Sequence, residues 1–204
     1  MHRLTVPIPD EAIRALHVGD TVYLNGVIVT GRDAAHKYMI EHFIRNKPTD
    51  PADIELHEKL KELLNGGVIY HCGPVVKKQE DGSWTFVAAG PTTSIREEVY
   101  EADVIKHFNL KGVIGKGGMG KRTLQACMDQ PAVYFHAIGG AATLIAQSVK
   151  EVIDVFKLDF GVPEAMWVIR VEDFPVVVTM DSHGQSIHDN VQKASEARFK
   201  QLIR

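Results

Sequence analysis

The spacing of hydrophobic and polar positions predicts a protein built from both helices and strands. Apolar residues that recur every three or four positions predict helices at 11–17, 33–46, 54–64, 94–109, 119–130, 139–157 and 187–202. Short apolar runs bounded by turn-forming residues predict strands at 5–9, 21–24, 27–30, 68–70, 112–114, 132–137, 166–171 and 175–180, and a hairpin over 75–89. The Asn25-Gly26 pair between two of these strands is typical of a tight hairpin turn.

The order of these elements favours a single α/β domain over 1–204. The first third is rich in hairpins, whereas the remainder alternates strand with helix, as in proteins with a parallel or mixed sheet. No internal repeat, low-complexity segment or long linker divides the sequence. Because the early hairpins need a layer of their own, we expect a three-layer β/β/α domain with a mixed or parallel central sheet rather than a doubly wound sheet.

Composition and charge narrow the classes of function. The chain carries 23 lysine and arginine residues against 26 aspartate and glutamate residues, a formal net charge of −3. It has no basic run dense enough to predict binding to nucleic acid. No apolar run predicts a membrane span, and the N-terminal segment lacks the apolar stretch of a secretion signal. Cys72 and Cys127 are too few for an iron–sulfur cluster or a zinc site, and they suit buried thiols of a reduced, cytoplasmic protein.

The glycine-rich segment Gly115-Lys-Gly-Gly-Met-Gly120 lies between a predicted strand and a predicted helix, where backbone N–H groups and a cation can bind a small anion. It fits the dinucleotide pattern G-x-G-x-x-G, but the next strand ends in Ile138-Gly-Gly140 instead of the acidic residue that binds ribose. It also fits the start of a P-loop, but Arg122 stands where serine or threonine should bind magnesium. A third interpretation is a tight turn that only allows close packing of helix and sheet.

Two further segments place a cation at a predicted turn from strand to helix. They are Thr30-Gly-Arg-Asp-Ala-Ala-His36 and Gly90-Pro-Thr-Thr-Ser-Ile-Arg96. With the glycine-rich segment they supply Arg32, Arg96 and Lys116. Arginine binds a carboxylate through two parallel hydrogen bonds and lysine acts as a compact charge, so these cations suit a small dicarboxylate.

The three segments, in this order, resemble the signature segments of the C-terminal domain of class I, iron–sulfur-dependent fumarases. The same module occurs as the separate β subunit of two-subunit fumarases and L(+)-tartrate dehydratases. The resemblance covers nearly the whole chain, from residue 18 to residue 177. It implies a swivelling β/β/α domain and a hydro-lyase that adds water to, or removes it from, a C4 dicarboxylate: fumarate/malate or tartrate/oxaloacetate. It also implies a hetero-oligomer in which an α subunit binds the [4Fe-4S] cluster, with no cofactor bound by this chain alone.

The resemblance assigns roles to single residues. It implies that Arg32 and Arg96 bind substrate carboxylates, and that Lys116 binds substrate and takes part in catalysis. It implies that Thr92 contacts substrate and serves as the catalytic base or a proton relay. A threonine hydroxyl needs a neighbour to take its proton. His36 is the nearest candidate in the sequence, and the alternative for it is a histidine that is exposed or lies in the N-terminal turn of a helix.

Other observations keep several alternatives open. The segment Glu97-Glu98-Val99 is more acidic than we expect of a fumarase, which leaves fumarate and tartrate both open as substrates. The ten histidines show no ligand spacing, so no metal site is expected and those other than His36 are interpreted as structural or surface residues. Two other functions remain: a non-catalytic module that binds small anions, and a dinucleotide-dependent oxidoreductase.

Overall fold

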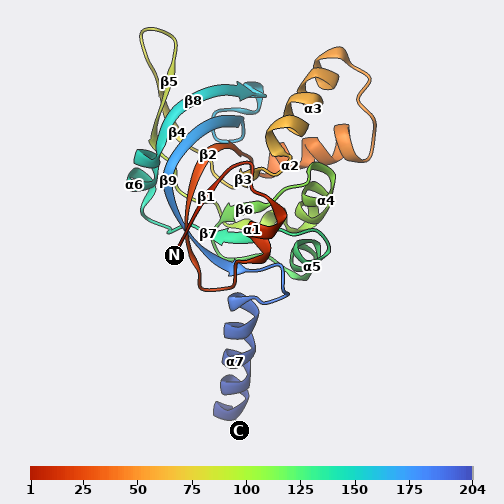
Figure 1. The fold of residues 1–204 in the computed structure, drawn as a ribbon, viewed down its shortest axis with the longest axis vertical. Coiled ribbons are helices and arrows are strands. Elements are labelled where there is room, and N and C mark those ends of the chain that lie inside the picture. The colour runs from red at the N-terminus through yellow and green to blue at the C-terminus, as the bar shows by residue number, and fades with distance from the viewer. Residues whose placement is uncertain (204) are drawn as a thin grey trace.

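The computed structural model describes residues 1–203 and centres on a mixed seven-stranded sheet (Figure 1). Its strands are β1 (His2–Thr5), β2 (Thr21–Thr30), β3 (Val68–Tyr70), β6 (Gly112–Gly115), β7 (Val133–His136), β8 (Val149–Phe156) and β9 (Met166–Met180), in the order β1-β2-β3-β6-β7-β9-β8. The first five in this order pair in parallel, whereas β9 is antiparallel to its neighbours. The expected α/β class with a mixed sheet is confirmed. A separate sheet, β4 (Val75–Lys78) with β5 (Trp84–Ala88), is the hairpin predicted over 75–89.

The 15-residue strand β9 closes the large sheet into a ring. Besides pairing with β7 and β8, it pairs with β2 from Thr21, opposite Val177, to Val29, opposite Val168. β2 also pairs with β3, and β3 is linked through β6 to β7. The strands β2, β3, β6, β7 and β9 therefore surround a common interior.

Long strands run through two positions where the sequence predicts a break. The hairpin predicted at Asn25-Gly26 is wrong, because both residues belong to β2 and the register with β9 shifts there at a bulge. Gly26 has a φ of +105°, which glycine adopts without strain, so it permits the bulge. β9 likewise continues through 172–174, and the two short strands predicted on either side form one.

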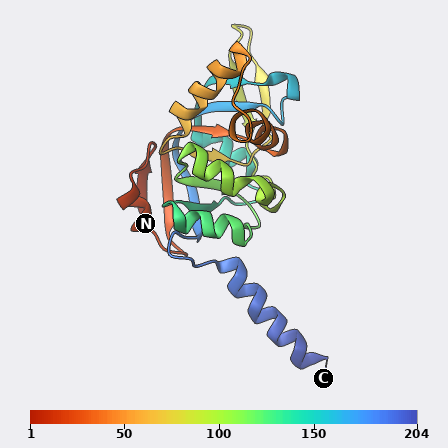
Figure 2. The ribbon, with the colours of Figure 1, turned by 90° about the vertical axis from the view of Figure 1, so that its right-hand side faces the viewer.

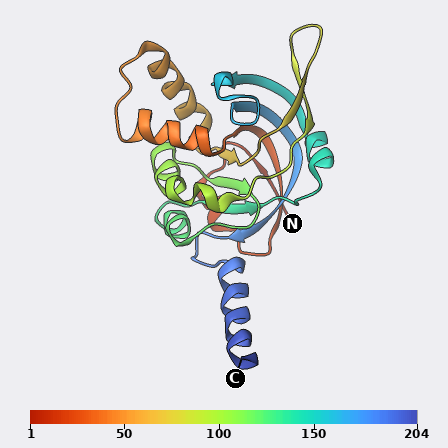
Figure 3. The ribbon, with the colours of Figure 1, turned by 180° about the vertical axis from the view of Figure 1, so that it is seen from behind.

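The helices lie mainly on one side of the sheet. They are α1 (Asp10–Arg14), α2 (Asp33–Met39), α3 (Pro51–Leu64), α4 (Glu98–Phe108), α5 (Lys121–Asp129), α6 (Ala142–Ser148) and α7 (Ile187–Leu202), with short 3₁₀ or π turns η1 (Ile40–Ile44), η2 (Ser94–Glu97) and η3 (Leu158–Phe160). The helices α2 to α5 cover one face of the sheet (Figure 2). The helix α7 extends away from the rest of the protein and buries none of its residues (Figure 3). Within residues 1–203, no helix is both long enough and apolar enough to cross a membrane.

The helix predicted over 139–157 is wrong in its second half. The helix α6 ends at Ser148, and the next eight residues form β8 along one edge of β9. This segment, Val-Lys-Glu-Val-Ile-Asp-Val-Phe, is rich in β-branched residues, which favour strands. Pairing with β9 also satisfies the backbone hydrogen-bonding groups of this segment, so it forms a strand instead of continuing the helix.

Alternate side chains of the central strands enter two separate hydrophobic cores. In β7, Val133 and Phe135 belong to the first core and Tyr134 belongs to the second. Residues of α1, α6 and β5 complete the first core, whereas α2 to α5 complete the second. The strands that carry the candidate site are therefore packed on both faces, which fixes their ends in place.

The two cysteines give a direct test of this arrangement. Cys72 lies in the first core and Cys127 in the second, both fully buried. Burial raises the pKa of the Cys72 thiol to about 12 and also raises the pKa of Cys127, so little of the reactive thiolate forms near neutral pH. We expect neither thiol to react with an aromatic disulfide reagent in the folded chain, and both to react at once in guanidinium. Rapid reaction of either thiol in the folded protein would contradict the placement.

Candidate functional site

The segments singled out in the sequence converge at one edge of the sheet. The strands β2, β3, β6 and β7 are parallel, so their carboxyl ends share that edge. Arg32 comes shortly after β2, His71 directly after β3 and Lys116 directly after β6. The Thr92 N–H donates to the His71 carbonyl at 2.6 Å, and the Thr92 carbonyl accepts from the Lys116 N–H at 3.1 Å. Thr92 is therefore held at this edge by both of its backbone groups.

Both predicted arginines are oriented by carboxylates of the chain itself. Arg32 Nη2 lies 3.3 Å from Glu164 Oε1. Arg96 binds Asp33 through two nitrogens, with Nε 3.2 Å from Oδ1 and Nη2 bound to Oδ2. Because Asp33 directly follows Arg32, this ion pair joins the two arginine loops. The side chains of Arg32 and Arg96 remain 20% and 51% exposed, so both stay within reach of a ligand.

The side chain of Lys116 lies toward the loop that follows β7. Its backbone forms a parallel bridge with Thr93, and the Ser94 N–H donates to the Lys116 carbonyl at 3.0 Å. A Cβ on Gly139, in the loop after β7, would lie only 3.7 Å from Lys116 Cδ. Lys116 therefore connects the loop of Thr92 to the loop after β7, and its side chain is only partly exposed.

His36 is placed differently from the exposed residue that the sequence allowed. It is the fourth residue of the seven-residue helix α2, and it is fully buried. His36 Nδ1 lies 2.8 Å from the Arg32 carbonyl, and Nε2 forms an ion pair with Glu101 Oε2 at 3.1 Å. Burial lowers the pKa of His36, but Glu101 and the carbonyl together raise it by more, so the net pKa is above its ordinary value.

His71 contacts the same carboxylate from the end of β3. Its Nε2 lies 2.9 Å from Glu101 Oε2, and its Nδ1 lies 2.8 Å from Ser94 Oγ. Burial works to raise the pKa of Glu101, but the imidazoles of His36 and His71 hold it down at about 2. The ligand atoms of these three side chains lie within 4.8 Å of one another, a grouping of histidines that the sequence spacing did not indicate.

Glu101 is the residue of this cluster that sequence reasoning missed. It lies on α4 four positions before Ile105 and one before Ala102, both buried. A glutamate on the buried face of an amphipathic helix was the available signal, because such a charge needs a partner inside the protein. The partners themselves could not be identified, since they come from α2 and β3.

The glycine-rich loop leads into a helix whose N-terminus already holds an anion. The Glu98 carboxylate accepts hydrogen bonds from the N–H groups of Gly120 at 2.7 Å and Arg122 at 3.0 Å, and from Thr123 Oγ1 at 2.6 Å. A Cβ at Gly120 would lie 2.5 Å from Glu98 Oε1, so this contact requires glycine. The N–H groups of Gly120 and Arg122 are therefore taken by Glu98 rather than free for a ligand, which disfavours both nucleotide patterns. Of the two unexpected acidic residues, Glu98 thereby has a structural role.

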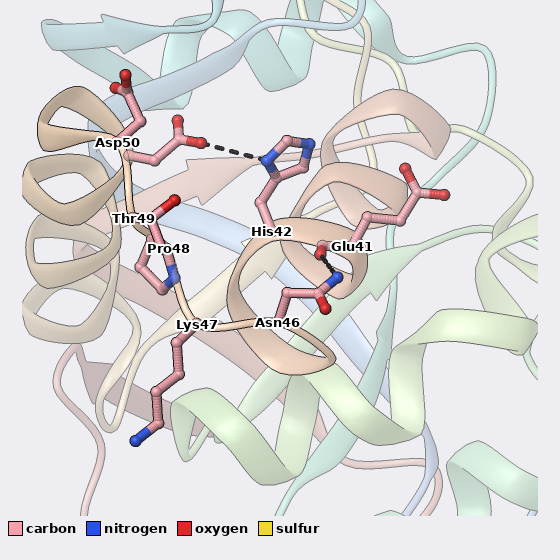
Figure 4. Close-up of a pocket in the computed structure, with 8 residues that line it drawn as sticks. Glu41, His42, Asn46, Lys47, Pro48, Thr49 and Asp50 are labelled. Carbon is pink, nitrogen blue, oxygen red and sulfur yellow. Dashed lines mark hydrogen bonds and ion pairs between the residues drawn. The ribbon is translucent and has the colours of Figure 1, made fainter.

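A surface pocket of about 560 Å³ lies away from these residues, between η1 and the start of α3 (Figure 4). It is lined by Glu41, His42, Asn46, Lys47, Pro48, Thr49, Asp50 and Asp53. Within it His42 Nδ1 lies 3.2 Å from Asp53 Oδ2. None of the residues predicted for the site contributes to this pocket, so the candidate site remains the carboxyl edge of the sheet.

Comparison with known proteins identifies the family. Residues 3–191 match the family model described as Fumarase C-terminus, and the chain belongs to this family. The resemblance found in the sequence is thereby confirmed.

Similar proteins carry two kinds of name. The chain is 51% identical over 199 residues to "Putative fumarate hydratase class I" of Geobacillus stearothermophilus, covering 98% of this chain but only 36% of that protein. It is 45% identical to "Putative L(+)-tartrate dehydratase subunit beta" of Methanocaldococcus jannaschii, covering 94% and 93% of the two chains. It is 39% identical to the L(+)-tartrate dehydratase subunit beta of Escherichia coli strain K12, covering 96% and 90%. The chain therefore spans about a third of the first relative and nearly all of the other two.

The capping role of Glu98 can be tested by stability. Glu98→Gln removes the negative charge at the N-terminus of α5, so we expect the free energy of unfolding in urea to fall by about 1–2 kcal/mol. Glu62→Gln is the matched control, because Glu62 is an exposed residue of α3 and its replacement should change stability by less than about 0.5 kcal/mol. Equal stability of the two variants would show that Glu98 does not stabilise this helix.

Proposed function

We propose that this chain is the β subunit of a two-subunit hydro-lyase that hydrates or dehydrates a C4 dicarboxylate, either fumarate/malate or tartrate/oxaloacetate. The observation that carries the proposal is the gathering of three cations at one edge of the sheet, Arg32, Arg96 and Lys116. The loop of Arg96 also carries Thr92, which binds the Lys116 backbone. Several cations beside one fixed hydroxyl suit a substrate with two carboxylates and a proton to lose. The names of the relatives support the same class of reaction.

In this proposal the arginines bind the substrate carboxylates. A guanidinium group has five N–H donors, so Arg32 can keep its contact with Glu164 and still offer N–H groups to a substrate. The same holds for Arg96 and Asp33. The two acidic residues then orient the arginines before substrate arrives, which lowers the entropy that binding must overcome. Lys116 adds a compact positive charge for the negative charge that develops when the C–H bond breaks.

Thr92 is proposed to transfer the proton of that C–H bond. Its two backbone hydrogen bonds hold the residue in place, which favours a defined position for the hydroxyl. The hydroxyl must pass its proton to a second group. His36 is a poor candidate for this group, because it is buried with one nitrogen on the Arg32 carbonyl and the other against Glu101. We therefore place the final proton acceptor on the partner subunit.

The partner is also proposed to bind the iron–sulfur cluster. The two cysteines of this chain do not fit a cluster, because Cys72 and Cys127 are buried in different cores. We propose that an α subunit supplies the cluster, and that residues 1–204 act as one swivelling three-layer domain against it in a cytoplasmic hetero-oligomer. The relatives named as β subunits support such a partner.

Reconstitution with the α subunit tests the proposed function. The purified chain, its cognate α subunit and their mixture are each assayed without oxygen on fumarate, malate and both tartrate enantiomers. We expect turnover only from the mixture, with one substrate pair preferred, because each chain supplies only part of the site. An inactive mixture with an intact cluster, or a chain that is active alone, would contradict the proposal.

Thr92 variants separate proton transfer from a structural role. In the assembled enzyme we expect Thr92→Ala to lower kcat by about 10²–10⁴-fold, the range of general acid–base contributions, with a smaller change in KM. Thr92→Ser keeps the hydroxyl and should retain much of the rate. If the serine and alanine variants have equal kcat and differ only in melting temperature, the threonine is structural.

A further inference from the structure

The buried carboxylate of Glu101 lies where the two loops of the candidate site meet the protein interior. It belongs to the first half of α4 and has no exposed surface. One of its oxygens, Oε2, contacts His71 Nε2 at 2.9 Å and His36 Nε2 at 3.1 Å. The two imidazole rings pack edge to face with their centres 5.0 Å apart. A single carboxylate oxygen therefore joins a residue of α2 to a residue at the end of β3.

Each histidine also connects Glu101 to the backbone of the candidate site, His36 through its imidazole and His71 through its own backbone carbonyl. His36 Nδ1 donates to the Arg32 carbonyl at 2.8 Å, since a carbonyl oxygen can only accept. The His71 carbonyl accepts the Thr92 N–H at 2.6 Å. One histidine thus fixes the residue that bears a guanidinium group, and the other fixes the residue that bears the proposed proton-transfer hydroxyl.

A chain of hydroxyl groups favours one tautomer of His71. The Tyr134 hydroxyl donates to Ser94 Oγ at 2.8 Å, which leaves the serine hydrogen free to donate to His71 Nδ1 at 2.8 Å. His71 then carries its proton on Nε2 and donates it to Glu101. His36 donates from Nδ1 to the Arg32 carbonyl while its Nε2 lies 3.1 Å from the Glu101 carboxylate, so we assign the positive charge of the cluster to His36.

The side chains around Glu101 are buried and charged, so they favour one defined geometry of this cluster. Residues 1–203 provide no hydrogen-bond partner for Glu101 Oε1 or for either carboxylate oxygen of buried Glu97, whose pKa burial raises, and His36 Nε2 meets Glu101 as an ion pair without the geometry of a hydrogen bond. Three titratable side chains face His36: Glu101 from α4, Glu97 from η2, and His71, which directly follows β3. Buried ion pairs contribute little net stability compared with apolar packing, but they impose defined geometry.

We propose that Glu101 is a positioning residue, which holds the loop of Arg32 and the loop of Thr92 in register through His36 and His71. This role rests on the function proposed above, because it explains how the two loops present their side chains to one substrate. Glu101 does not reach the substrate itself. Its charge matters because an amide cannot keep the His36 imidazolium in place.

The test replaces Glu101 by glutamine, with Asp103→Asn as the matched control on the exposed side of the same helix. In the isolated full chain, nitrogen-15 NMR should show His36 doubly protonated at neutral pH in the wild type and in the control. In Glu101→Gln, burial without a counter-charge lowers the pKa of His36, and the ring should be neutral. Hydrogen exchange of the Thr92 and His36 amides should become at least tenfold faster in Glu101→Gln alone.

In the assembled enzyme we expect Glu101→Gln to lower kcat/KM by about ten- to a hundredfold, while the circular dichroism spectrum stays unchanged. We also expect the activity of this variant to recover in part at lower pH, because His36 then regains its proton. Unchanged amide exchange, or wild-type kcat/KM with neutral His36, would overturn the proposal. Stoichiometric zinc or another divalent metal in the purified chain, lost in Glu101→Gln, would also overturn it in favour of a metal site. If even the wild-type assembly is inactive, the function proposed above fails, while the exchange data still decide whether Glu101 fixes the loops.

Discussion

The pairing of β9 with both β2 and β7 is the constraint on which the candidate site depends. It closes β2, β3, β6, β7 and β9 into a ring. The four of these strands that are parallel, β2, β3, β6 and β7, are then fixed between two packed cores. Their carboxyl ends then share one edge, which is where ligands bind in many α/β proteins. Arg32, Thr92 and Lys116 come from segments far apart in sequence. Their loops lie at one edge of the sheet because these strand ends are held together.

Carboxylates of the chain orient two of the three cations at this edge. Glu164 orients Arg32, and Asp33 orients Arg96. Glu98 binds the N-terminus of α5, and Glu101 contacts the buried histidines. This arrangement explains how an acidic chain can present cations to the anionic substrate proposed above. The two arginines are held in place by partners that leave part of each guanidinium group accessible, so a dicarboxylate would meet arginines that are already oriented.

Local patterns predicted what depends on local interactions. The alternation of strand and helix gave the α/β class, and the signature segments gave the family. The hairpin at Asn25-Gly26 failed because β9, more than 140 residues away in sequence, pairs with both halves of β2 and overrides the local turn preference. Glu98 and Glu101 could not be placed because their roles depend on partners outside α4. The sequence showed their charge but not that one caps α5 and the other is buried between imidazoles.

The structure of the assembled enzyme with an unreactive dicarboxylate bound tests the central claim most directly. The account predicts that Arg32 and Arg96 contact the ligand carboxylates within about 3.2 Å, the range of a hydrogen bond, while each keeps its own acidic partner. It also predicts that Lys116 and the Thr92 hydroxyl face the ligand from the same edge of the sheet. A dicarboxylate bound only by residues of the partner subunit, with this edge facing solvent, would contradict the account.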